Sequence, residues 1–272
     1  MIQESEAIMI RSLAILMLAT ILTEVRGHFT MLLPGTSSAK KGEEVIILYQ
    51  FGHPFEHQLF DAPPPARMVV LGPDGKSKSL TKTLEKIKVK GTDGKDVVAY
   101  RIRFTPELRG DFTFFLNTPP IWMSEDKEFL QDTVQVVLHV QAQKGWDLDR
   151  GPGFKILPLT RPYGLRPGMV FQGEVRDRIL DPEGAFALTP PLKGLPVFIE
   201  RFNPKPPKEL PADELITFAA KTDPNGVLTT TLPSPGWWSI TAQRNDGSRN
   251  YQGKDYPVRK RTTLWVYVDD KE

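Results

Sequence analysis

The sequence predicts an all-β protein: two antiparallel β-sandwich domains of immunoglobulin-like type that follow an N-terminal signal peptide. The first observation is that 25 prolines and 21 glycines divide the 272 residues into short apolar runs, as is typical of strands joined by turns. The second is alternation, as in residues 133–141, where Val134, Val136, Leu138 and Val140 share one face. The third is that no stretch has the pattern of a helix longer than two turns.

Residues 1–27 have the features of an export signal. Arg11 precedes an uncharged, mostly apolar core, Ser12–Leu22, and Val25 and Gly27 offer short side chains at the positions that a signal peptidase inspects. A core of 11 residues is well short of the ~20 that span a bilayer as a helix. We therefore expect cleavage after Gly27 and a periplasmic or secreted protein that does not span the membrane. An uncleaved anchor is the alternative.

The first predicted domain covers residues 28–155. Its first strand ends at Pro34, and in Val45–Phe51 successive side chains face opposite sides. Thr92-Asp93-Gly94 predicts a hairpin between two of the later strands. The strands expected in this domain are 28–34, 45–51, 66–71, 84–90, 96–104, 112–116 and 133–141.

The second predicted domain covers residues 165–272. Asp223-Pro224-Asn225-Gly226 and Pro235-Gly236 predict tight turns between its strands. A polar loop is expected over Arg244–Lys260, and its charge run, Lys254–Arg261, is expected to stay solvated. Trp237 and Trp238 should face opposite sides of a strand, one in the core and one at the rim. The expected strands are 169–175, 195–202, 216–222, 227–232, 237–243 and 262–268.

Composition excludes several classes of function. The formal net charge of +2 is spread along the chain, so we expect no nucleic-acid partner. The absence of cysteine excludes disulfides, thiolate metal ligands and a lipidated cysteine. The sequence also contains no serine nucleophile elbow, no phosphate-binding glycine loop and no His-Glu-x-x-His run, so an enzyme is not expected. Oxidation at a copper ion is the one catalytic route left open.

Histidines supply the candidate site. Of the four in the chain, His53 and His57 lie in Gly52-His53-Pro54-Phe55-Glu56-His57, directly after an apolar strand. Cleavage after Gly27 would give His28 a free α-amino group beside its imidazole, and the two together can chelate one metal ion. One more imidazole would complete a set of three nitrogen ligands, which suits copper, nickel, cobalt or zinc.

His53 is the preferred partner of His28, because it lies at a strand end and precedes a proline that stiffens the loop. His57 would share a face with His53 if the segment formed a helical turn. His139, on the polar face of its strand, could reach the site only if that face borders the loop. The predicted metal ligands are thus His28, His53, His57 and His139, and the alternative is an ordinary polar surface turn.

Several motifs resemble those of a known family. Three of them are Gly52-His53, the run Leu159-Thr160-Arg161-Pro162-Tyr163-Gly164-Leu165, and Pro235-Gly236-Trp237-Trp238. Together they look like the exported nickel- or cobalt-uptake accessory proteins, the NikK/NikM-like group whose core is a domain of unknown function. The resemblance implies a periplasmic protein with a transthyretin-like or carboxypeptidase-regulatory-like C-terminal module and a membrane metal importer as partner. Asp132 stands where that family has a histidine, so a specific role in nickel binding is not implied.

The function expected from sequence is therefore that of an exported accessory protein. It would capture or deliver a divalent transition-metal ion (nickel or cobalt, with copper as a further option) for uptake. The alternative is a non-catalytic structural or interaction protein of the cell envelope.

Overall fold

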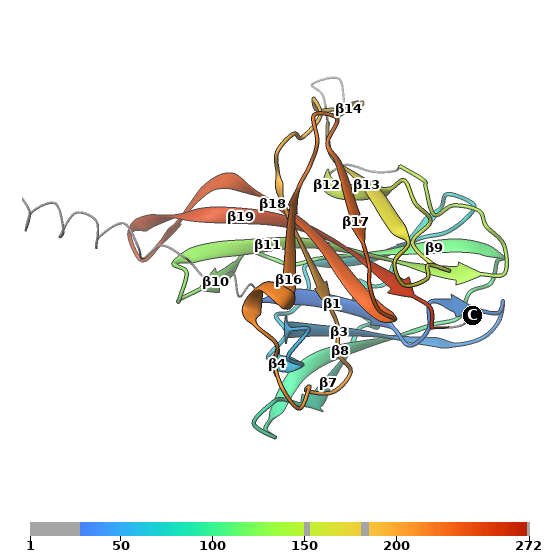
Figure 1. The fold of residues 1–272 in the computed structure, drawn as a ribbon, viewed down its shortest axis with the longest axis horizontal. Coiled ribbons are helices and arrows are strands. Elements are labelled where there is room, and N and C mark those ends of the chain that lie inside the picture. The colour runs from blue at the N-terminus through green and yellow to red at the C-terminus, as the bar shows by residue number, and fades with distance from the viewer. Residues whose placement is uncertain (1–27, 150–152, 181–184, 271–272) are drawn as a thin grey trace, which may run out of the picture.

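The computed structural model describes residues 28–149, 153–180 and 185–270, and in these ranges the protein is all-β (Figure 1). Strands run from β1 to β19, and the described helices are two short 3-10 turns, η1 (Thr81–Thr83) and η2 (Asp213–Leu215). Each sheet formed by the described residues is open. No helix in the described part of the chain is long and apolar enough to cross a membrane. The predicted signal peptide, residues 1–27, lies outside the described residues.

Sheet A has five antiparallel strands and carries the beginning of the described chain. Its order is β1-β3-β8-β7, with β4 paired to the end of β3. Alternation in β3 places Val45, Ile47 and Tyr49 in the core, as the sequence predicts. The strands are β1 (Phe29–Pro34), β3 (Val45–His53), β4 (Gln58–Phe60), β7 (Glu85–Lys90) and β8 (Asp96–Phe104).

Sheet B has ten strands and draws them from both predicted domains. Its order is β16-β15-β18-β19-β11-β9-β5-β6, with β10 and β2 also paired to β11. The strands are β2 (Ser38–Ala39), β5 (Arg67–Leu71), β6 (Ser77–Ser79), β9 (Gly110–Asn117), β10 (Ile121–Met123), β11 (Glu128–Val140), β15 (Pro196–Arg201), β16 (Thr217–Lys221), β18 (Gly236–Tyr251) and β19 (Lys254–Val268).

A parallel pair, β11 with β19, joins the two halves of sheet B, with Val134 opposite Thr263. The sequence predicts only antiparallel pairing, so this link is a finding of the structure. The number of domains and their bounds, 28–155 and 165–272, stay predictions.

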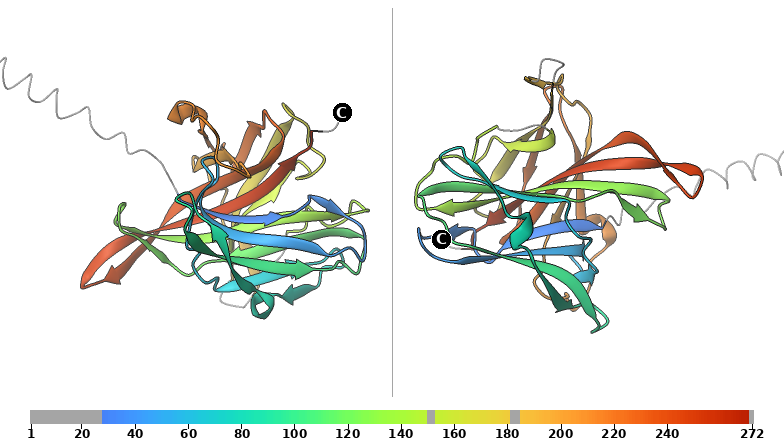
Figure 2. Two further views of the ribbon diagram at one scale, coloured as in Figure 1. Left: turned by 90° about the horizontal axis from the view of Figure 1, so that it is seen from below. Right: turned by 180° about the vertical axis from the view of Figure 1, so that it is seen from behind.

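Sheet C has four strands, β12 (Gly153–Pro158), β13 (Val170–Leu180), β14 (Phe186–Leu188) and β17 (Val227–Thr231). One hydrophobic core lies between sheets A and B and contains Ile47 and Trp265. A second core lies between sheets B and C and contains Phe171 and Val266. Sheet B is therefore the middle layer, as the views in Figure 2 show.

Trp237 and Trp238 illustrate this arrangement. They face opposite sides of β18, as predicted, and Trp237 packs in the first core while Trp238 packs in the second. Both are buried, so the prediction that one of them lies at the rim is wrong. Where a sheet is covered on both faces, the residues of a strand are buried continuously, and buried and exposed residues no longer alternate. Residues 237–242 form such a run.

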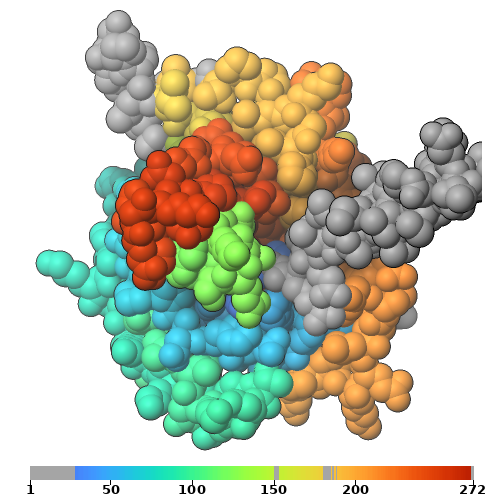
Figure 3. All heavy atoms as spheres, turned by 90° about the vertical axis from the view of Figure 1, so that its left-hand side faces the viewer, coloured from blue at the N-terminus to red at the C-terminus, as the bar shows by residue number. Residues whose placement is uncertain are grey.

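The predicted polar loop Arg244–Lys260 is also wrong, because most of it belongs to the long β18–β19 hairpin. Its polar residues pair across the hairpin, for example Asn250 with Asp255, where the Asn250 amide donates to Asp255 Oδ1 at 3.0 Å. At the tip, Tyr251 and Tyr256 pack against Trp122 of β10, each with ring centroids 4.7 Å apart. Figure 3 shows this red hairpin beside the light-green β10–β11 segment.

The charge run Lys254–Arg261 is solvated only in part. Lys254 and Asp255 are exposed, as expected. Arg259 instead forms an ion pair with Glu128 at 2.7 Å, and Arg261 is only 4% exposed. The charge pattern of the sequence does not reveal this, because the acidic partners lie in β11.

Candidate functional site

The structure brings two of the predicted histidines together. His28 precedes β1, and β1 pairs antiparallel with β3 in a register that sets Phe29 opposite Gly52. Continuing that register places His28 next to His53, the last residue of β3. The two imidazole rings have centroids 4.7 Å apart. Metal–nitrogen bonds of about 2.0–2.1 Å put both rings within reach of one ion.

His28 is held in a largely apolar setting. Its ring lies 5.5 Å from Phe51 and 4.8 Å from Phe60, centroid to centroid. Burial, together with His53 and the positive charge of Arg261, lowers the pKa of His28 to about 4. The imidazole is therefore neutral at pH 7, which is the form that binds metals.

The Nδ1 atom of His28 is buried and has no hydrogen-bond partner in the described structure. A buried polar atom without a hydrogen-bond partner costs about 1–3 kcal/mol of folding free energy. A bound metal ion would remove this cost, because a neutral imidazole nitrogen can donate its lone pair to a metal ion.

A cavity of about 640 Å³ opens beside these rings. Glu56 lies in its wall, and its Oε2 atom is also buried without a hydrogen-bond partner. Two imidazoles and two carboxylates thus face one space. The lining residues are His28, His53, Glu56, Gln58, Phe60, Thr92, Glu125, Pro206, Pro207 and Leu210.

The loop 54–57, which follows His53, is fixed to the end of β15. The Asn203 backbone N–H donates to the Pro54 carbonyl at 3.0 Å, and the Asn203 side-chain amide donates to the Phe55 carbonyl at 2.6 Å. The Phe55 N–H donates to Glu200 Oε1 at 3.1 Å. These anchors hold the backbone that leads out of the candidate site, and the sequence gives no sign of them.

His57 belongs to this anchor. Its Nδ1 donates to the Asn203 carbonyl at 2.8 Å, and its backbone has a positive φ of 52°. The side chain does not line the cavity that His28 and His53 share. The helical turn that would place His57 beside His53 does not form, since residues 54–57 are a turn within the β3–β4 hairpin.

Glu200 lies under the same loop and is 3% exposed. Its Oε2 accepts a hydrogen bond from the Thr217 hydroxyl at 2.6 Å. Burial raises the pKa of Glu200 to about 7, and the charge of Glu56 contributes to the rise. A carboxyl group that titrates near neutral pH therefore supports the histidine loop.

His139 is in another part of the molecule. It lies on β11, on the strand that carries Asp132, and Asp132 accepts a hydrogen bond from Thr30, two residues beyond His28. At about 3.3 Å per residue, Asp132 and His139 are about 23 Å apart along the strand. His139 Nδ1 contacts Asp111 Oδ1 at 2.8 Å, and its ring stacks on Tyr163 at 4.3 Å. The structure does not bring His139 to the cavity.

Asp132 is fully engaged in an ion pair. Its two oxygens accept hydrogen bonds from Arg261, each at 2.7 Å, and Asp132 is 2% exposed. With Thr30 also bonded to it, side chains occupy three of the roughly four acceptor positions of the carboxylate. The residue that stands in place of the expected family histidine is a structural one.

Among residues 28–149, 153–180 and 185–270, no group of three or more histidine, aspartate and glutamate side chains is arranged to hold a metal ion. The candidate site thus consists of a pair of adjacent imidazoles with a carboxylate in the cavity wall. Such a pair needs a further donor, and the α-amino group that cleavage after Gly27 would create is one.

Comparison with known proteins gives a family. A family model described as a domain of unknown function, DUF4198, matches residues 25–246. No curated protein matches the chain. The match covers the candidate site and most of both cores, but not their β19 residues such as Trp265 and Val266.

Solved structures give distant likenesses. A Pseudomonas aeruginosa protein described as a candidate carbohydrate-binding protein has 16% identity over 45% of this chain and 84% of its own, with a TM-score of 0.22. A mutant α-2-macroglobulin from Salmonella has 14% identity over 89% of this chain and 15% of its own, with a TM-score of 0.26. A DUF4785 family protein from Legionella pneumophila has 12% identity over 78% and 51%, with a TM-score of 0.26. Scores this low carry no inference about function.

Proposed function

We propose that this chain, which belongs to the DUF4198 family of domains of unknown function, binds one divalent transition-metal ion through His28 and His53. The observation that carries the proposal is the buried, unpartnered Nδ1 of His28 beside the ring of His53. The low pKa of His28 supports it, because protons do not compete for that ring until the pH falls to about 4.

The α-amino group of His28 completes the proposed ligand set once the preceding residues are removed. Nitrogen ligands of this kind suit copper, nickel, cobalt and zinc, and intrinsic affinity favours copper among them. Metal supply would then decide between copper and the nickel or cobalt that the family resemblance suggests. Glu56 is positioned in the cavity wall to add a carboxylate oxygen.

The proposed role is that of an exported accessory protein that captures a metal ion and hands it to a membrane importer. A site with few protein ligands in an open cavity is suited to exchange, since an incoming ligand can reach the ion before the old ones leave. No reaction is assigned to this site.

The test is metal titration of protein that begins at His28, followed by calorimetry with Cu²⁺, Ni²⁺, Co²⁺ and Zn²⁺ in turn. We expect one ion per chain, and we expect His53→Ala to weaken binding at least a hundredfold, in line with the loss of a direct ligand. A chain that carries Gly-Ser ahead of His28 should bind more weakly, because its amine is displaced.

His139→Gln is the matched control, since His139 is remote from the cavity and should leave the affinity unchanged. If none of the four metals binds, or if His53→Ala binds as the unaltered protein does, the proposal is wrong.

A further inference from the structure

A second cavity lies on the face of sheet B that is turned away from sheet A, and it shares no residue with the histidine cavity. Its volume is about 280 Å³. Alternation along β5 and β9 turns Met68 and Phe114 into the first core. The same alternation turns Arg67 and Phe115 to the opposite face, where β12 covers the sheet only in part.

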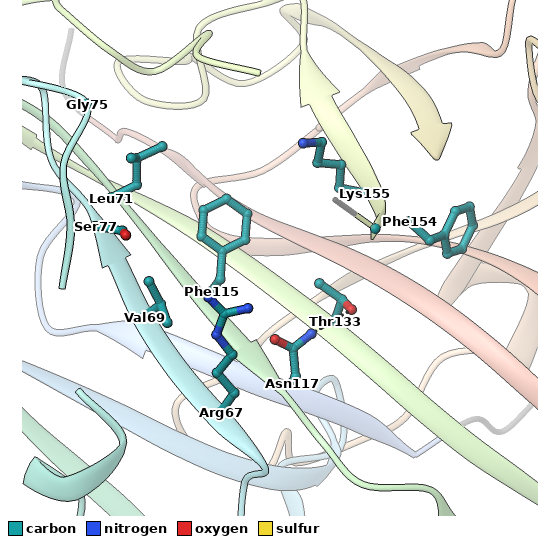
Figure 4. A pocket seen from close by; sticks show the side chains of 11 residues that line it. Arg67, Val69, Leu71, Gly75, Ser77, Phe115, Asn117, Thr133, Phe154 and Lys155 are labelled. Atoms are coloured by element: carbon teal, nitrogen blue, oxygen red, sulfur yellow. Dashed lines mark hydrogen bonds between the residues drawn. The ribbon is translucent and has the colours of Figure 1, made fainter. Parts of the chain in front are cut away.

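The floor of this cavity is apolar. Val69 and Leu71 are 9% and 7% exposed although they face away from the first core. Phe115 stands opposite Val69 in the register, and its ring is half-buried. Figure 4 shows the Phe115 ring rising from the strands between Leu71 on one side and Lys155 on the other. The exposed face of the Phe115 ring can stack with one ring of a ligand.

The rim of the cavity is polar. Asn117 stands opposite Arg67, and its side-chain amide donates to the Thr133 hydroxyl at 2.9 Å. That bond leaves the hydroxyl hydrogen of Thr133 and the amide oxygen of Asn117 available to a bound molecule. The hydroxyl groups of a ligand could form hydrogen bonds with these two groups.

The charge at the cavity is positive. None of the described residues that line it is an aspartate or glutamate, and the cations among them are Arg67 and Lys155. Lys155 is bound to Asp149 at 2.7 Å. Arg67 makes no ion pair within the described part of the chain and is exposed, so its guanidinium is the group that can meet an anion. A guanidinium recognises a carboxylate with two parallel hydrogen bonds.

We propose that this cavity binds a small carboxylic acid that bears a single ring. The ring lies on Phe115 and the carboxylate pairs with Arg67. Ligand sites usually measure ~300–1,000 Å³, so a volume of about 280 Å³ fits one ring and its substituents and excludes a chain of several. Two kinds of molecule share this chemistry, uronic acids and aromatic carboxylic acids.

Saturation-transfer NMR and calorimetry with four probes test the proposal: galacturonate, galactose, benzoate and benzyl alcohol. We expect one or both acids to bind and their neutral counterparts to bind at least tenfold more weakly. Binding of galacturonate alone identifies a sugar acid, and binding of benzoate alone identifies an aromatic acid. If no probe binds, or if the neutral molecules bind as well as the acids, the proposal is overturned.

Two substitutions sharpen the test. Arg67→Gln should lower the affinity at least tenfold without loss of folding, because the side chain is exposed. Phe115→Leu should also weaken binding, since it keeps an apolar side chain but removes the ring. The controls are Arg109→Gln, an exposed arginine outside the cavity, and His53→Ala, which affects only the other site. Unchanged affinity in Arg67→Gln would also overturn the proposal.

Discussion

Glu200 shows how a single buried side chain can make the protein sensitive to pH. Its pKa of about 7 in the folded protein lies above the ordinary value of 4.5. The folded state therefore holds this proton more tightly than the unfolded state does. Stability from this group is fully present below pH 4.5 and is lost as the pH rises through 7.

The corresponding prediction concerns Glu200→Gln, which keeps the shape but cannot ionise. Between pH 5 and pH 9, the free energy of unfolding of the unaltered protein should fall by about 3 kcal/mol relative to that of the variant. The reason is that each tenfold difference in proton affinity between the folded and the unfolded state is worth about 1.4 kcal/mol. Urea denaturation at several pH values measures the difference. Parallel curves for the two proteins would contradict the assignment.

Asp132 and Arg261 form a buried ion pair whose partners come from sequence-distant strands. Asp132→Ala leaves the guanidinium buried without its counter-charge and should lower the free energy of unfolding by about 3–5 kcal/mol. The control is Glu85→Ala, which breaks the more exposed pair with Arg101 and should cost about 0–1 kcal/mol. Chemical denaturation measures both free energies of unfolding, and equal decreases in the two variants would refute the prediction.

At the scale of elements, the turn from β3 to β4 depends on a glycine. Gly52 has a φ of +148°, and a Cβ there would lie 1.9 Å from the Gln58 carbonyl oxygen. Gly52→Ala must therefore shift β4 away from β3 and displace His53. We expect lower stability and, if the metal proposal holds, weaker metal binding.

The comparison for this variant is Gly42→Ala. Gly42 also has a positive φ, +83°, but no atom lies within 4 Å of the added Cβ. Gly42→Ala should lower the free energy of unfolding only by the backbone strain, roughly 1–2 kcal/mol, and should leave metal binding unchanged. A Gly52→Ala protein that matched Gly42→Ala in both measurements would show that the close contact is unimportant.

Much of sheet A could be predicted from the sequence, because one face of its strands meets the core and the other meets water. The alternation in β3 and β8 follows directly from that difference. The proximity of His28 and His53 could also be predicted, since His28 directly precedes β1 and His53 ends β3, the strand that pairs with it. The partners Glu200 and Asn203 were not accessible, because they reach the loop from a strand nearly 150 residues away and have no local pattern.

Sheet B was harder to predict. Strands covered on both faces lose their alternation, and the outer half of the β18–β19 hairpin is polar enough to resemble a loop. Its strand character depends on cross-strand partners and on the aromatic contacts of Trp122. Neither is visible in a single stretch of sequence.

For the whole molecule, the shared sheet leads us to predict one cooperative unfolding transition. Trp265 reports on the first core and Trp238 on the second, and both belong to the β18–β19 pair. Fluorescence of Trp238→Phe and Trp265→Phe variants should give the same urea midpoint as circular dichroism. Two separate midpoints would show that the halves unfold independently.

The parallel contact between β11 and β19 also sets an order of events during synthesis. Phe129 pairs with Val258 across more than a hundred intervening residues, so the edge of β11 stays open until residues 254–268 have emerged. Until then the first core lacks Trp265, its largest fully buried side chain. Pairing over such a span is slow. The nascent chain therefore completes its central sheet only after β19 has been made, and a factor that shields β11 during that interval would limit aggregation.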